Sequence, residues 1–134
     1  MNGIGLDVAT RLIAAAQEKA REIAVPMVIT IVDDGGNLKA MNRMDGAILA
    51  SIDISQGKAF TAVACNDSTE AIAPAVQPGQ SLYGLHATNG GRLVIFGGGI
   101  PLRSGDTLVG AIGVSGGSVE EDVVVATAGA RAFE

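Results

Sequence analysis

Glycine recurs through residues 93–117, and this stretch constrains the fold more than any other feature of the chain. Residues 92–96 are typical of a strand, the glycines at 97–99 interrupt it, and residues 100–103 continue it. A turn at residues 104–106 leads into a last strand at residues 108–115. We therefore predict that the parts before and after this turn pair as a hairpin.

One face of this predicted last strand carries almost no side chain. Successive side chains of a strand point to opposite faces. One face therefore presents Val109, Ala111, Gly113 and Ser115. We expect a nearly bare surface there, open to a close neighbour or a ligand.

The first half of the chain predicts a helix, a hairpin and a second helix. Residues 6–23 repeat apolar side chains at helical spacing, and Pro26 ends that helix. Residues 27–33 and 38–44 are predicted strands joined by a glycine turn. Asp45 can cap the next helix, and Gly57 lies inside it. Because a glycine within a helix costs about 1 kcal/mol relative to alanine, we expect another backbone to approach Gly57 closely.

Residues 66–91 are the least regular part, with short helices expected near 69–73 and 81–88. Such long irregular segments often carry function. Ser118 and Glu121 form a capping box that starts a closing helix. The whole chain of 134 residues, 1–134, therefore predicts a single α/β (α+β) domain with the order α-β-β-α-α-β-β-β-α.

Amino-acid composition and charge exclude some classes of binding partner. A net charge of -5 without clustered Lys or Arg argues against nucleic acid and anionic membranes. The sequence shows no apolar run long enough to span a bilayer and no signal peptide, so we expect a cytoplasmic protein. Mean hydropathy is high, at +0.38, for so small a chain, and we expect a homo-oligomer in which partner chains cover apolar surface.

Several short motifs, taken in order, resemble the GlcG/HbpS-like (haem-degrading domain) family, which includes the C-terminal domain of PduO-type cobalamin adenosyltransferases. The motifs are VDDGGNL at 32–38, RMDGA at 43–47, SIDI at 51–54 with KA at 58–59, YGL at 83–85, GGIP at 98–101 and GAIGVSGG at 110–117.

This resemblance implies a profilin-like antiparallel sheet of about five strands with flanking helices. It also implies a homo-oligomer that binds haem or another tetrapyrrole, or that serves cobalamin-dependent diol, glycerol or glycolate metabolism. Many members carry a histidine directly after the Gly-Gly of the first hairpin, where this chain has Asn37. An amide is a poor iron ligand, which removes one candidate haem contact.

A ligand site is expected around the triple glycine. Arg43 and Lys58 could hold carboxylates such as haem propionates, while an apolar wall and close backbone approach come from Phe96, Gly97, Gly98 and Gly99. The alternative is that both cations form structural ion pairs, with Asp45 or Asp53 as partners. His86, the only histidine, is the candidate axial haem ligand, with an ordinary surface histidine as the alternative.

No catalytic residue and no protein-only metal site is predicted. Residues 113–117 match G-x-S-x-G, but no histidine follows Ser115, as a hydrolase triad requires. Cys65 is expected to be a small buried thiol. The leading hypothesis is thus a small-molecule-binding or accessory protein. The alternatives are a cofactor-free lyase, isomerase or hydrolase, and a purely structural oligomeric subunit.

Overall fold

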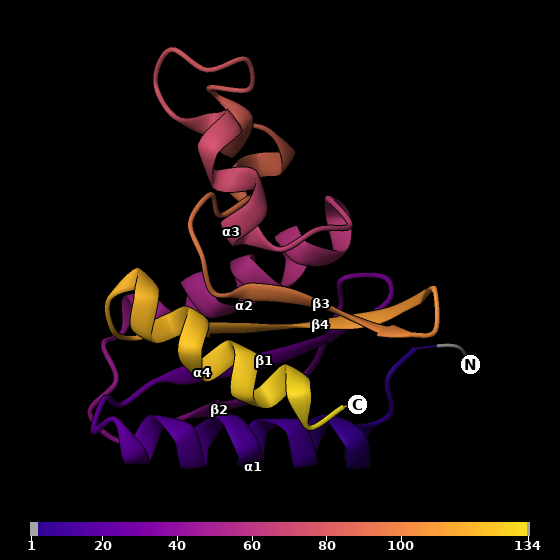
Figure 1. The fold of residues 1–134 in the computed structure, drawn as a ribbon, viewed down its shortest axis with the longest axis vertical. Helices are drawn as coiled ribbons and strands as arrows, with labels where there is room; N and C mark the ends of the chain where they lie inside the picture. The colour runs from indigo at the N-terminus through magenta and orange to yellow at the C-terminus, as the bar shows by residue number, and fades with distance from the viewer. Residues whose placement is uncertain (1–2, 134) are drawn as a thin grey trace.

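The computed structural model describes residues 3–133 and shows a three-layer α/β arrangement (Figure 1). Four antiparallel strands form one sheet in the order β2-β1-β4-β3. Their bounds are β1 Val28–Asp33, β2 Leu38–Arg43, β3 Gly99–Ser104 and β4 Thr107–Ser115. The predicted mixed α/β class with an antiparallel sheet is confirmed, with four strands rather than about five.

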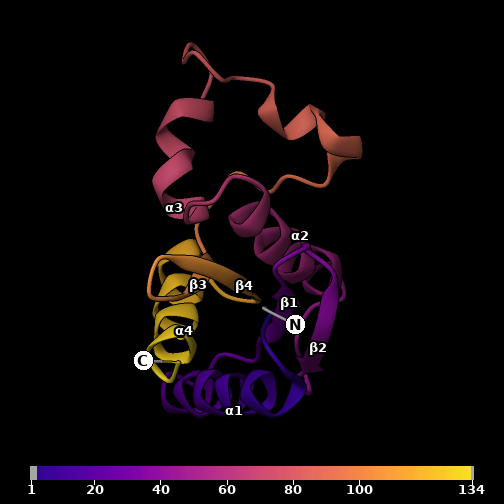
Figure 2. The ribbon, with the colours of Figure 1, turned by 90° about the vertical axis from the view of Figure 1, so that its right-hand side faces the viewer.

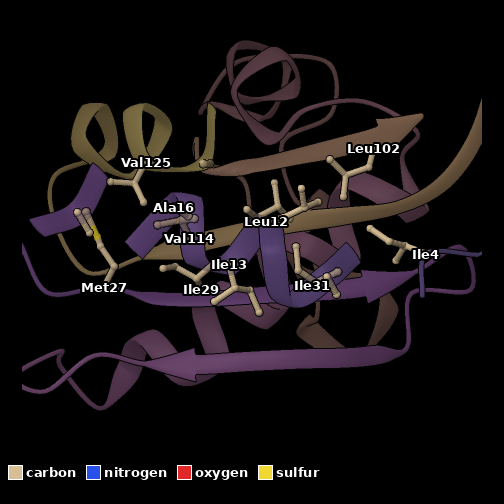
Figure 3. Packing of buried hydrophobic residues seen from close by; sticks show 14 of the residues in the cluster. Ile4, Leu12, Ile13, Ala16, Met27, Ile29, Ile31, Leu102, Val114 and Val125 are labelled. Carbon is tan, nitrogen blue, oxygen red and sulfur yellow. The ribbon is translucent and has the colours of Figure 1, made fainter. Parts of the chain in front are cut away.

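Helices α1 (Leu6–Glu22) and α4 (Val119–Arg131) cover one face of the sheet and enclose the main core (Figures 2 and 3). Ile29 and Ile31 of β1 and Ile112 of β4 point into it against Leu12 and Val125 of the two helices. These side chains are fully buried, and each contributes about 1.5–3 kcal/mol relative to an exposed position. The spacing of α1 in the sequence thus predicts its buried face correctly.

Helix α2 (Ala50–Ala64) covers the opposite face, and its packing explains the glycines of the last two strands. A Cβ atom at Gly113 would collide with the Ser55 carbonyl oxygen, and one at Gly99 with the Lys58 carbonyl oxygen. Ala111 of β4 packs directly on Ala59 and Ala62 of this helix. The face that was expected to be bare is therefore covered by the chain itself.

Two local predictions are confirmed. Ser118 Oγ accepts a hydrogen bond from the Glu121 N–H at 3.1 Å, and Glu121 Oε1 accepts one from the Ser118 N–H at 2.8 Å, which completes the capping box of α4. At Gly57, a Cβ atom would lie 2.7 Å from a methyl carbon of Val94 and 3.3 Å from the Arg92 carbonyl oxygen. The glycine inside α2 is needed because a second segment crosses there.

That crossing segment corrects the strand count. Residues 92–96 do not join the sheet, because they run along α2 and the Val94 N–H is taken by Thr61 Oγ1 at 2.9 Å. The Val94 N–H, which in a sheet would donate to a carbonyl of a neighbouring strand, donates to this helix hydroxyl. The strand prediction for this segment was wrong.

Two helix starts also differ from the predictions. Asp45 does not cap α2: it lies in a turn at residues 45–46, and the helix begins at Ala50 with Leu49 as its N-cap. A helix at residues 81–88 is replaced by turns and one 3₁₀ turn, η2 (Leu85–Ala87), because Gly84 adopts φ +104°. Local composition did not reveal these conformations.

Residues 73–92 form an arm that projects from the three layers (Figures 1 and 2). It follows α3 (Thr69–Ile72), which the sequence predicts closely, and contains η1 (Ala73–Val76), η2 and η3 (Asn89–Gly91). Leu82 and Tyr83 are exposed at 50% and 60% on it. Within the described residues, no helix is long and apolar enough to cross a membrane.

Replacing Gly113 by alanine tests the helix-on-sheet contact. The added methyl would force α2 away from β4, and we expect the free energy of unfolding to fall by about 1–3 kcal/mol. Urea denaturation measures it. Gly5→Ser is the control, because a side chain at Gly5 meets open space and serine is favoured at that N-cap. Equal midpoints for the wild type and Gly113→Ala would contradict the packing described.

Candidate functional site

Lys58 lies at the centre of the predicted ligand site, and its ammonium is bound by the protein itself. It is fully buried. Its Nζ donates to Asp122 Oδ2 and to the Val114 carbonyl oxygen, both at 2.8 Å. The same Nζ lies 5.0 Å from the centre of the Phe96 ring. The partner of this structural ion pair is therefore Asp122 and not Asp45 or Asp53.

Asp122 completes the network from α4. Its second oxygen, Oδ1, accepts a hydrogen bond from the Gly117 N–H at 2.9 Å. Because Lys58 belongs to α2 and Asp122 to α4, the pair connects helices on opposite faces past the end of β4. Buried ion pairs of this kind need such additional hydrogen bonds to offset desolvation.

Burial dominates the titration of both groups. Desolvation lowers the pKa of Lys58, and the hydrogen bond and charge of Asp122 oppose this shift. Desolvation also raises the pKa of Asp122, while the hydrogen bonds from Lys58 and Gly117 oppose it. The charged form of each group is thus stabilised mainly by its partner.

The structure brings most of the predicted ligand-binding residues together, but not all. Lys58 lies against the buried Gly98 and Gly99, and its ammonium lies beside the Phe96 ring. Gly97 lies against Val123 of α4. Arg43 lies apart from them, exposed at the end of β2, where it lines a different hollow.

A half-open hollow of about 360 Å³ lies on the outer side of α2, between this helix and residues 91–94 at the end of the arm. The Arg92 guanidinium carbon lies 3.6 Å from the centre of the Phe60 ring, a close cation–π stack. Both residues line the hollow with Asp53, Ile54, Gln56, Gly57, Gly91 and Val94. Arg92 and Phe60 were not predicted as site residues, although Gly57 inside α2, which lines the same hollow, indicates that a second segment approaches there.

The first hairpin and the arm lie next to parts of this hollow. Gly36, at φ +79°, packs so tightly on the Phe60 ring that a Cβ atom there would lie 2.8 Å from it. Asn37 follows directly and is exposed. His86 is exposed on the arm, edge-on to Tyr83 with ring centres 5.7 Å apart.

The other candidate side chains have structural surroundings. Ser115 is buried and its hydroxyl shares a 2.9 Å hydrogen bond with Ser51. Burial and the nearby Asp67 carboxylate raise the pKa of the half-buried Cys65 thiol, which disfavours the reactive thiolate. Residues 3–133 contain no group of three or more His, Cys, Asp or Glu side chains able to hold a metal ion.

Comparison with known proteins identifies the family. The model of the haem degrading protein HbpS-like family matches residues 4–131. This chain belongs to the HbpS-like family. An HbpS-like relative from Citrobacter freundii, a 15.0 kDa protein of the dhaT-dhaS intergenic region, is 50% identical over 92% of this chain and 87% of its own length. The predicted resemblance is confirmed.

Two other proteins similar to this chain carry ligand or enzyme names. The corrinoid adenosyltransferase PduO of Citrobacter freundii is 45% identical over 87% of this chain, which spans only 35% of that protein. The crystal structure of the PduOC:heme complex superimposes with a TM-score of 0.93 at 39% identity, covering 97% of this chain and 94% of the other.

Breaking the buried pair should be costly. We expect Asp122→Asn to lower the free energy of unfolding by about 3–5 kcal/mol, because Lys58 is left buried without a counter-charge. Glu22→Gln, which removes the exposed Lys19–Glu22 pair, should cost less than about 1 kcal/mol. Urea denaturation at pH 7 compares them, and equal small losses would contradict a buried ion pair.

The same variant should show a defined pH dependence. Without Asp122 the pKa of Lys58 is lowered further, so the unfolded state binds more protons between that pKa and the ordinary value of 10.5. The free energy of unfolding of Asp122→Asn should therefore rise with pH in this window. Urea titrations at several pH values measure the slope, and Lys58→Met/Asp122→Asn should lose it.

Proposed function

We propose that this protein binds haem in the hollow between α2 and residues 91–94, as a ligand-binding or accessory protein. The observation that carries the proposal is the Arg92–Phe60 stack inside a half-open hollow. The heme complex of its HbpS-like relative PduOC supports the choice of ligand.

The residues of the hollow fit a flat apolar ring with carboxylate substituents. Ile54, Phe60 and Val94 supply apolar surface, and Gly57 leaves the face of α2 without a side chain. Arg92 supplies a guanidinium, which pairs with carboxylates through two parallel hydrogen bonds. These residues would hold the macrocycle edge and one propionate.

His86 is the proposed axial ligand. It is the only histidine of the chain, is exposed on the arm, and precedes Gly91 and Arg92 of the hollow by five or six positions. An imidazole nitrogen is the common protein ligand of haem iron, and the bound iron supplies ligand-exchange and redox chemistry. The chain's own contribution is to orient the ring and to limit water at one side of it.

Lys58 has a supporting role in this proposal, with Phe96 and Gly97–Gly99. The Lys58 ammonium donates to Val114 of β4 and Asp122 of α4, so it ties α2 to these two elements. It also lies beside Phe96 and Gly98, which precede β3. Arg43 belongs to another part of the surface.

We also propose that the protein is cytoplasmic and self-associates. Ile48 and Leu49 are exposed at 59% and 77%, and Leu82 and Tyr83 are exposed on the arm. Burying such side chains against a second copy would remove apolar surface from water. Its HbpS-like relationship to PduO supports a link to cobalamin-dependent diol or glycerol metabolism.

A purely structural subunit is the second candidate. The glycines of β3 and β4 favour it, because they make room for the backbone of α2 and not for a ligand. Such a subunit would not bind hemin at a defined site, so a hemin titration separates the two functions.

Hemin titration of the apo protein should shift the Soret band and saturate at one site per chain. Arg92→Leu should weaken binding by about tenfold, since it removes one charge-assisted contact. His86→Ala should change the position of the Soret band, because it removes the iron ligand. Both side chains are exposed, so these variants are expected to fold.

Arg11→Leu is the matched control, because Arg11 is exposed on α1 and distant in sequence from the hollow. It should bind hemin like the wild type. No saturable Soret shift in the wild type would overturn haem binding. Unchanged spectra and affinity in both His86→Ala and Arg92→Leu would overturn the proposed location.

A further inference from the structure

A second hollow, of about 350 Å³, lies where the end of α1 meets the end of β2. Gln17 and Arg21 come from α1, and Arg43, Met44 and Asp45 from the end of β2 and the turn after it. A hydrogen bond from the Asn42 amide to Gln17 Oε1 fixes the helix beside the strand. It also leaves the Gln17 NH₂ group as a donor.

The charges of this hollow are not balanced. Arg21 and Arg43 are both exposed, and among residues 3–133 neither guanidinium has a carboxylate within 4.0 Å. Glu22, the acidic neighbour of Arg21, is engaged by Lys19 at 3.0 Å. The hollow is thus lined by two cations and one carboxylate, that of Asp45. The net positive charge of this lining attracts an anion.

We propose that this hollow binds a small hydroxylated phosphate ester. The two guanidiniums would pair with the phosphate oxygens in the bidentate geometry that arginine provides. The Gln17 NH₂ would donate to the same group, and the Asp45 carboxylate would accept a hydrogen bond from a hydroxyl of the ligand. The site is independent of the haem hollow, because the two share no lining residue.

Chemical-shift titration of the ¹⁵N-labelled full chain tests the site with three probes: glycerol 3-phosphate, inorganic phosphate and glycerol. We expect saturable shifts at residues 17, 21 and 43–45 with the phosphate ester, weaker binding of inorganic phosphate and none with glycerol. Affinity should also fall as salt increases, because both cations are exposed.

Three variants of the lining arginines distinguish specific binding in this hollow from nonspecific attraction of phosphate to surface cations. Arg21→Gln and Arg43→Gln should each weaken binding by about tenfold or more, while Arg43→Lys keeps the charge and should still lose affinity. Arg11→Gln, on α1 outside the hollow, should bind like the wild type. Both lining arginines are exposed, so the variants are expected to fold, and their amide spectra verify this.

Several outcomes would overturn the proposal. They are the absence of a saturable shift with glycerol 3-phosphate, equal affinity of wild type and Arg43→Gln, and an effect of Arg11→Gln as large as that of Arg21→Gln. Shifts at these residues that depend on protein concentration, and not on added phosphate ester, would also overturn it, because they would assign the hollow to a second copy.

Discussion

The close approach of α2 to β3 and β4 is the constraint on which the rest of the structure depends. Backbone of the helix lies where side chains of Gly99 and Gly113 would otherwise be. This contact brings Lys58 through to the far side of the sheet end, where Asp122 of α4 neutralises it. Because a buried charge without its partner is strongly destabilising, the helix can adopt few other positions.

This packing decides where a ligand can bind. The glycine-lined surface, which looks open in the sequence, is filled by the chain's own backbone and by Lys58. The hollows lie instead on the outer side of α2 and at the junction of α1 with β2. Each combines residues from two separate segments and contains arginine. Binding at such places leaves the central layers undisturbed.

The sequence predicts features that depend on neighbouring residues. The capping box of α4, the amphipathic α1 and the close approach at Gly57 are of this kind. The strand prediction fails for residues 92–96, because the Val94 N–H binds the Thr61 hydroxyl of α2 and not a neighbouring strand. Lys58 and Asp122 are 64 positions apart, and nothing in their local sequence marks them as partners. The Arg92–Phe60 stack likewise requires the tertiary path of the arm.

The glycines of β3 and β4 admit the backbone of α2, and we therefore place haem on the outer side of this helix. A crystal structure of the hemin-loaded protein, with diffraction measured at the iron absorption edge, tests it most directly. We predict an anomalous peak beside His86, over the hollow lined by Phe60 and Arg92. A peak beside Gly97–Gly99, with Lys58 released from Asp122, would contradict it.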